Sequence, residues 1–179
     1  MRIISGTLGG RRISVPKSFS ARPTTDIARE ALFNILSNRI DFEDLAVLDL
    51  FSGTGSVSME FYSRGVTTLT SVEMSAVYAS FIKKNMQELG ITGTKIVCAN
   101  VFKFLPKARA ASYDLIFADP PFDLDGRTEI VNLVFEHNLL KPDGLLIVEH
   151  SPNDNYHESP FFMEVRHYGK VNFSFFKKN

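Results

Sequence analysis

Short apolar runs that alternate with stretches of helical periodicity constrain the fold of this chain more than any other feature. Five runs predict strands, at residues 46–50, 68–73, 94–98, 113–118 and 144–149. The stretches between them predict helices, at residues 55–64, 75–90, 101–106 and 127–138. Buried strands that alternate with helices are typical of a parallel sheet with helices on both faces. The sequence therefore predicts an α/β fold.

The N-terminal part of the chain has a different pattern. Residues 2–15 alternate loosely around Gly6, Gly9 and Gly10, which predicts a short β-hairpin followed by a loop. From Thr25 onward, apolar residues recur at spacings of three and four, which is the pattern of an amphipathic helix. We expect Thr24 or Thr25 to cap this helix.

The C-terminal part predicts an antiparallel end to the sheet. Two β-rich runs, at residues 161–167 and 170–176, are joined through Gly169, as in a β-hairpin. We therefore expect a sheet that is mostly parallel and closes with an antiparallel hairpin. The expected organisation is an N-terminal hairpin with a basic loop over residues 1–23, followed by one α/β domain over residues 24–179.

Charge is distributed unevenly along the chain. The whole chain carries 20 basic and 20 acidic residues, so its net charge indicates no partner. Residues 1–40, however, contain seven basic and two acidic side chains and thus carry a net charge of +5. This asymmetry predicts that the first segment faces a polyanion.

The remaining composition excludes several classes of protein. Cys98 is the only cysteine, so no intramolecular disulfide can form, and we interpret it as a buried structural thiol in a reducing compartment. The sequence shows neither a signal peptide nor an apolar run of about 20 residues, which predicts a cytoplasmic protein. The four histidines lack the spacing of metal ligands, so we expect no metal. We expect a monomer.

A glycine loop follows the first predicted strand. Asp49 lies near the end of that strand, Phe51 follows it, and Gly53 and Gly55 allow a tight turn and close approach of a ligand to the backbone. Ligands of parallel sheets bind beyond the carboxyl ends of the strands. The motif predicts a nucleotide-like cofactor, although a simple strand-to-helix turn without a ligand would look similar.

The ends of the next two strands supply further candidate cofactor residues. Glu73 lies about 20 residues after the glycines, where its carboxylate could accept hydrogen bonds from both ribose hydroxyls, and Met74 follows it. Asn100 could face an adenine edge, with the Val101 amide beside it, or it could simply cap a helix. A dehydrogenase would share the acidic residue, but the loop lacks a third glycine in the dinucleotide register and the chain has no room for a substrate domain.

The fourth predicted strand runs directly into Asp119-Pro120-Pro121-Phe122. Two prolines end the strand and fix a rigid loop. The Asp119 carboxylate and the Pro120 carbonyl could accept hydrogen bonds from the two N–H groups of an exocyclic amine, while Phe122 stacks on the base, a contact worth about 1–3 kcal/mol. With the glycine loop, this motif predicts methyl transfer from S-adenosylmethionine to a base amine, which must be single-stranded, looped out or flipped.

Nearly the whole chain resembles the RsmD-like methyltransferases, which methylate the 2-amino group of a guanine in bacterial small-subunit ribosomal RNA. Besides the two motifs above, the resemblance rests on three blocks: Arg2-Ile3-Ile4-Ser5-Gly6 with the Gly9-Gly10-Arg11-Arg12 pair, Arg22-Pro23-Thr24-Thr25-Asp26, and Arg29-Glu30-Ala31-Leu32-Phe33-Asn34-Ile35-Leu36. The resemblance implies a class I methyltransferase fold with a Rossmann-like seven-stranded sheet. It also implies S-adenosylmethionine as cofactor and ribosomal RNA or the small-subunit particle as partner.

The resemblance assigns roles residue by residue. Asp49, Gly53 and Gly55 would lie along the methionine and ribose side of the cofactor, and Glu73 would bind the ribose. Asn100 replaces the aspartate that is common in the family, and Ile27 stands where many members have a basic residue. The RNA phosphates would be held by residues of the first segment, namely Arg11, Arg12, Lys17, Arg22 and Thr24.

Two other functions fit the sequence less well. An adenine or cytosine amino methyltransferase acting on DNA could use the same Asp-Pro-Pro-Phe loop, but no separate sequence-reading domain is visible. A catalytically silent RNA-binding module could retain the fold, but it would have no use for the amine-holding residues Asp119 and Phe122.

Overall fold

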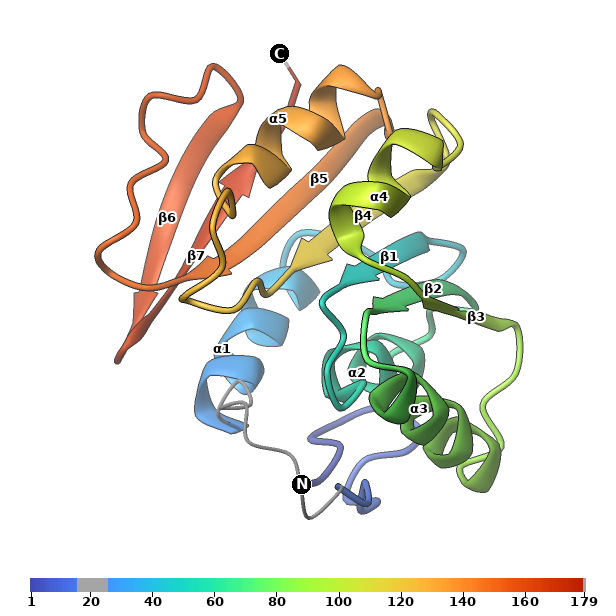
Figure 1. Ribbon diagram of the computed structural model, residues 1–179. Helices are drawn as coiled ribbons and strands as arrows, with labels where there is room; N and C mark the ends of the chain where they lie inside the picture. The colour runs from blue at the N-terminus through green and yellow to red at the C-terminus, as the bar shows by residue number, and fades with distance from the viewer. Residues whose placement is uncertain (16–25, 179) are drawn as a thin grey trace.

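The computed structural model describes residues 1–15 and 26–178 and contains one seven-stranded mixed sheet (Figure 1). Its spatial strand order is β3-β2-β1-β4-β5-β7-β6. The strands are β1 Ala46–Leu50, β2 Thr68–Glu73, β3 Thr94–Cys98, β4 Tyr113–Ala118, β5 Leu140–His150, β6 Phe162–Tyr168 and β7 Val171–Phe176. The first five are parallel, and β7 pairs antiparallel with both β5 and β6. The expected mostly parallel sheet with a closing hairpin is confirmed.

The fifth strand departs from its predicted start. We expected the strand to begin at Gly144, but β5 already begins at Leu140, which pairs with Tyr113. The register then shifts before Leu115 pairs with Leu145. Asp143 adopts a φ of 65°, so the turn-forming residues make an irregularity within the strand instead of ending it.

The helices cover both faces of the sheet (Figure 1). They are α1 Asp26–Ser37, α2 Ser56–Ser63, α3 Ala76–Glu88, α4 Val101–Phe104 and α5 Glu129–Glu136, with a 3-10 turn at Leu105–Lys107. Alternate residues of the central strands point to opposite faces. Val47 and Leu115 pack in the cluster with α1, α2 and α3, whereas Leu48 and Ile116 pack in the cluster with α4 and α5. This double burial explains why the strands appear as continuous apolar runs.

The N-terminal residues form a hairpin-like segment that packs on the helices instead of joining the sheet. Arg2 and Arg12 form an isolated antiparallel bridge, and the Ile3 amide donates to the Arg11 carbonyl over 2.9 Å. Gly6 has a φ of +83°, and a Cβ there would lie 1.9 Å from the Ser63 carbonyl oxygen. Only glycine therefore permits this close approach to the end of α2.

Two further contacts fasten the same segment beside the glycine loop. The Asn85 side chain of α3 accepts from the Ser14 amide at 3.1 Å and donates to the Ser14 carbonyl at 3.2 Å. The Thr54 hydroxyl lies 3.6 Å from the sulfur of Met1. The first segment thus reaches the loop that follows β1.

Two interpretations of the sequence need correction. Cys98 is exposed, not buried, because β3 lies at the edge of the sheet. The positive charge of the first 40 residues is also partly internal. Arg29 has no exposed surface and pairs with Glu60, so its charge stabilises the fold and is not available to a polyanion. Arg39 is exposed, but its charge is matched by Glu164.

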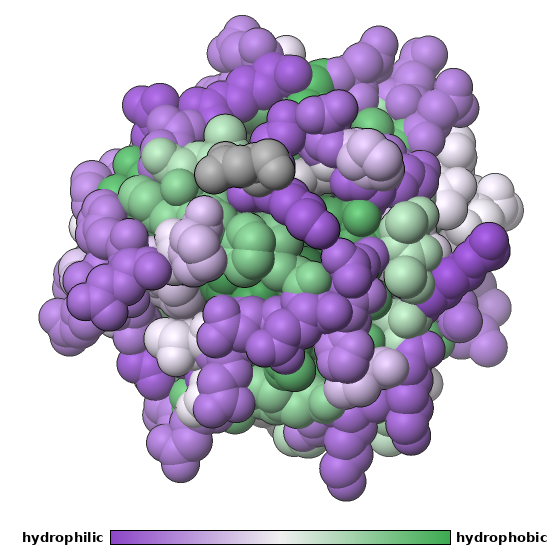
Figure 2. All heavy atoms as spheres, turned by 90° about the horizontal axis from the view of Figure 1, so that it is seen from above, coloured by the Kyte–Doolittle hydropathy of each residue, from purple (hydrophilic) through white to green (hydrophobic). Residues whose placement is uncertain are grey.

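Seen from above, the surface is largely hydrophilic, and apolar side chains appear in smaller areas between the polar ones (Figure 2). In the described part of the chain, no helix combines the length and the apolar character that a membrane span requires. Over the same residues, histidine, cysteine and carboxylate side chains form no group of three that could hold a metal ion.

Candidate active site

A cavity of about 690 Å³ opens at the carboxyl ends of the parallel strands. The strand order reverses between the adjacent strands β1 and β4, the position at which open parallel sheets bind ligands. Each of the five parallel strands contributes a polar side chain to the cavity, in or just after its last residues: Asp49, Glu73, Asn100, Asp119 and Glu149. The size and mixed lining are those of a small-molecule site.

The loop between β1 and α2 holds a strained backbone. Phe51, Gly53 and Gly55 all have positive φ angles, of 60°, 53° and 75°. Such an angle is unusual for Phe51, which has a Cβ, and it is characteristic of ligand-binding turns. A Cβ at Gly55 would also lie 3.0 Å from two carbons of Ile82. The glycine loop therefore keeps a fixed shape at the floor of the cavity.

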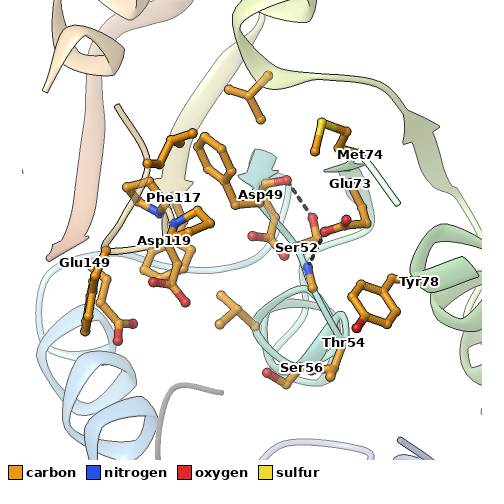
Figure 3. A pocket seen from close by; sticks show the side chains of 18 of the residues that line it. Asp49, Ser52, Thr54, Ser56, Glu73, Met74, Tyr78, Phe117, Asp119 and Glu149 are labelled. Atoms are coloured by element: carbon orange, nitrogen blue, oxygen red, sulfur yellow. Dashed lines mark hydrogen bonds between the residues drawn. The ribbon is translucent and has the colours of Figure 1, made fainter. Parts of the chain in front are cut away.

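The carboxylate of Glu73 holds this loop against β2. One of its oxygens accepts from the Gly53 amide at 2.9 Å and the other accepts from the Ser75 amide at 2.7 Å. Figure 3 shows the Glu73 side chain pointing toward the glycine loop. Because each carboxylate oxygen has more than one lone pair, both can also accept from hydroxyl groups of a ligand.

The next part of the wall is formed by Met74, Asn100 and Val101. Met74 is 67% exposed although it is apolar, which is typical of a side chain that covers a ligand. The Asn100 side chain accepts from the Lys103 amide at 3.3 Å and so caps α4, while it also lines the cavity. The structure thus confirms the helix cap, while the contact with adenine stays a prediction.

Asp49 lies beneath the glycine loop and is only 1% exposed. Its carboxylate accepts a hydrogen bond from the Ser58 hydroxyl, which lies 2.7 Å from the hydroxyl of Ser71. The Ser52 hydroxyl donates to the Asp49 carbonyl at 2.8 Å (Figure 3). Burial raises the pKa of Asp49 from 3.8 to about 7, because the apolar surroundings penalise the charged form more than the hydroxyl groups stabilise it.

This raised pKa predicts a pH-dependent effect of Asp49→Asn on stability. Between pH 3.8 and about 7, the unfolded chain has lost the Asp49 proton while the folded protein retains it. The ionisation of Asp49 therefore lowers the free energy of unfolding of the wild type as pH rises, by up to about 1.4 kcal/mol per pH unit. The neutral amide of Asp49→Asn removes this loss. In urea unfolding, the stability of the variant relative to the wild type should therefore increase from pH 4 to 7, with Asp41→Asn as an exposed control. A stability difference that stays constant with pH would contradict the prediction.

The Asp-Pro-Pro-Phe loop forms the opposite wall of the cavity. The Asp119 amide reaches back to the Leu50 carbonyl at 3.4 Å, so the loop starts beside β1. Asp119 is half-buried and lines the cavity with Pro120, whose ring is buried. Phe122 lines it as well and is 46% exposed, which leaves a ring face available to a ligand. The two predicted motifs thus share one cavity.

Several residues of the cavity were not identified from the sequence as site residues, and those from β5 and the C-terminal hairpin are the furthest from the predicted motifs along the chain. Glu149, near the end of β5, is 2% exposed and lies beside Asp119 of the Asp-Pro-Pro-Phe loop (Figure 3). Tyr168, Lys170 and Val171 come from the β6–β7 hairpin and close one side of the cavity. Glu149 could have been found from the sequence, because it is an acidic residue at the end of an apolar strand. The hairpin residues could not, because they reach the cavity only through tertiary packing.

The structure describes two of the five predicted RNA-contacting residues. Arg11 and Arg12 are exposed on the N-terminal hairpin. The other three, Lys17, Arg22 and Thr24, lie outside the described residues, as do both expected caps of α1.

Comparisons with known proteins agree with this architecture. Ribosomal RNA small subunit methyltransferase D of Buchnera aphidicola subsp. Baizongia pistaciae is 36% identical over 149 residues, which cover 83% of this chain and 75% of that protein. The structure of Escherichia coli yhhF, a candidate methyltransferase by its name, is 30% identical with a TM-score of 0.84 and covers 98% of this chain and 96% of that one. A SAM-dependent methyltransferase from Agrobacterium tumefaciens, at 19% identity, shares the fold with a TM-score of 0.64 over 83% of this chain and 61% of that one.

The seven-stranded sheet and these structural neighbours confirm the expected class I methyltransferase fold. A family model described as Conserved hypothetical protein 95 matches residues 1–177. With that match and the relative of 36% identity, the chain belongs to the Conserved hypothetical protein 95 family, the family of ribosomal RNA small subunit methyltransferase D.

Proposed function

We propose that this protein is an S-adenosylmethionine-dependent methyltransferase of small-subunit ribosomal RNA, and that its acceptor is the 2-amino group of a guanine. The observation that carries the proposal is the single cavity that joins the glycine loop after β1 to Asp119-Pro120-Pro121-Phe122 after β4. Its relative named ribosomal RNA small subunit methyltransferase D supports the RNA substrate. The chemistry of the site supports an exocyclic amine as the acceptor, and the family resemblance supports guanine.

The residues on the β1–β3 side of the cavity fit the cofactor. Gly53 lines the cavity and leaves room for close approach of a ligand to the backbone, and Glu73 presents a carboxylate to ribose hydroxyls. Gly55 shapes the loop from its other side, where it lies against Ile82. Met74 offers an apolar surface for an adenine ring, and Asn100 lies beside it, with its amide nitrogen 3.7 Å from the Met74 sulfur. When bound, the cofactor supplies an electrophilic methyl group.

The residues on the β4 side fit a base amine. An amine attached to a nucleobase is a weak nucleophile because its lone pair is shared with the ring. Hydrogen bonds from its two N–H groups to the Asp119 carboxylate and the Pro120 carbonyl would favour a tetrahedral nitrogen and turn the lone pair toward the methyl group. Phe122, which is 46% exposed at the cavity, would stack on the base. Holding both reactants in line supplies much of the rate enhancement.

The cavity accepts a base only after the base has left its helix, so the RNA must present a flipped or unpaired nucleotide. The N-terminal hairpin can hold the surrounding phosphates. It is anchored beside the glycine loop through Met1 and Thr54, and its exposed Arg11 and Arg12 are available for phosphate contacts. Phosphate contacts would position the RNA, while the cavity selects the base.

The experiment that tests this function maps modified nucleosides in small-subunit ribosomal RNA from cells with and without the gene. Purified protein and labelled S-adenosylmethionine should then restore one N2-methylguanosine to the unmodified RNA. A restored methyladenosine or methylcytidine would overturn the guanine assignment and favour an adenine or cytosine amino methyltransferase. RNA binding without any methyl transfer would instead indicate a catalytically silent binding module.

Replacing Arg11 and Arg12 by alanine should weaken RNA binding and reduce its salt dependence. Each lost phosphate contact lowers the slope of log K against log salt concentration by about 0.7–0.9, so the double variant should lose between about 1 and 2 units of slope. Binding is measured by fluorescence anisotropy over a salt series, with cofactor binding unchanged.

The matched control replaces Lys107 and Arg109, which are exposed and precede β4, at the edge of the sheet opposite the cavity. This control should retain the wild-type slope. A wild-type slope in the Arg11 and Arg12 variant would reject the hairpin as a phosphate-binding surface.

A further inference from the structure

We propose that Glu149 is the residue that selects guanine, because its carboxylate accepts a hydrogen bond from the N1–H group of the acceptor base. This inference rests on the proposed function and extends it. It assigns to one side chain the discrimination between guanine and the other two bases that carry an exocyclic amine.

The sheet register places Glu149 beside the catalytic aspartate. Ala118 of β4 pairs with Val148 of β5 in parallel register. Asp119 and Glu149 are the next residues on these two neighbouring strands, whose axes are about 4.8 Å apart. Both side chains line the cavity, and in Figure 3 their carboxylates lie on the same side of it. A base amine held by Asp119 therefore has Glu149 as a neighbour.

The surroundings of Glu149 make its carboxylate part of the cavity and not of the outer surface. Its residue is 2% exposed, and it pairs across β5 and β7 with Phe173, which is fully buried. The β6–β7 hairpin adds Tyr168 and Lys170 to the wall of the same cavity. A carboxylate only accepts hydrogen bonds, so a base that offers a donor at this position is favoured over one that offers a lone pair.

The edge of guanine offers three donors in a row. Two belong to the 2-amino group, for which Asp119 and the Pro120 carbonyl are the proposed acceptors. The third is N1–H, the neighbour of that amine on the ring, and a second carboxylate beside Asp119 can accept it. Adenine and cytosine carry an acceptor nitrogen next to their amine instead. They would set a lone pair against the Glu149 carboxylate, which replaces an attractive contact with repulsion.

The test uses synthetic RNA that contains the mapped target nucleotide as either guanine or 2-aminopurine. 2-Aminopurine retains the 2-amino group, but its N1 is an acceptor without a proton. Wild-type protein should methylate the 2-aminopurine RNA with a kcat/KM about 10- to 100-fold lower than that for the guanine RNA, the range expected for one good base contact. This ratio is the readout for the variants.

Glu149→Gln should bring the ratio between the two RNAs close to one, because an amide can accept from N1–H or donate to an unprotonated N1. A role in folding alone would lower methylation of both RNAs equally and leave the ratio unchanged. Glu158→Gln, a change of the same kind in the exposed segment before β6, should keep the wild-type ratio.

The possible results separate this inference from the proposed function. If Glu149→Gln retains the wild-type ratio, the inference is overturned while the function stands. If wild-type protein methylates both RNAs equally well, the inference is also overturned. This result needs only wild-type protein, so it holds even if the Glu149 variant fails to fold. If wild-type protein transfers no methyl group to the guanine RNA, the proposed function fails, and this inference fails with it.

Discussion

Replacing Asp119 by alanine should lower kcat for methyl transfer by about 10²- to 10³-fold and leave cofactor affinity nearly unchanged. The carboxylate stands at the start of the loop after β4, on the wall of the cavity opposite Glu73. Its proposed role is to hold the acceptor amine, and loss of one preorganised polar group at a reacting centre commonly costs this much. Single-turnover transfer of labelled methyl groups to the RNA measures kcat, and calorimetry measures cofactor binding.

Two further variants locate the effect in the carboxylate. Asp119→Asn keeps an oxygen that can accept one hydrogen bond, so its loss should be smaller than that of the alanine variant. Asp125→Ala removes an exposed carboxylate from the same connection between β4 and α5 without touching the cavity, and its turnover should stay normal. Normal turnover in Asp119→Ala, with the cofactor still bound, would exclude Asp119 as the residue that holds the amine.

The sequence predicted the parallel strands well because burial on both faces makes them continuous apolar runs. The strands β1, β2, β3 and β4 begin and end at the predicted residues. The cofactor and catalytic motifs could also be predicted, since glycines and prolines limit the backbone locally wherever they occur. Asp49 and Asp119 therefore lie where the strand pattern placed them, on opposite sides of the point where the strand order reverses.

What the sequence could not show depends on contacts between distant segments. Lys170 reaches the cavity because the hairpin of β6 and β7 packs antiparallel against β5, and no local pattern specifies that register. Arg29 looked like part of a basic RNA-binding face, yet it is fully buried against Glu60, which is 31 residues away. Cys98 was expected inside because its neighbours are apolar, but an edge strand exposes it.

Arg29→Met should destabilise the protein by about 3–5 kcal/mol, the loss expected when one partner of a buried ion pair is removed. Both Arg29 and Glu60 are 0% exposed, and the Arg29 Nε lies 3.3 Å from a Glu60 oxygen. The variant leaves the Glu60 carboxylate buried with Arg64 as its remaining charged partner among the described residues. Urea unfolding gives the loss, and Lys84→Met, which breaks an exposed pair with Glu88, should cost at most about 1 kcal/mol.

The same variant should loosen the N-terminal hairpin more than the sheet. The guanidinium of Arg29 donates to the Arg2 carbonyl at 2.6 Å, and Glu60 accepts from the Ile4 amide, so the pair binds the first segment to α1 and α2. Hydrogen exchange at the Ile3 and Ile4 amides should therefore accelerate more than exchange in β1. If exchange rises equally in both places, the pair stabilises the domain as a whole and does not position the hairpin.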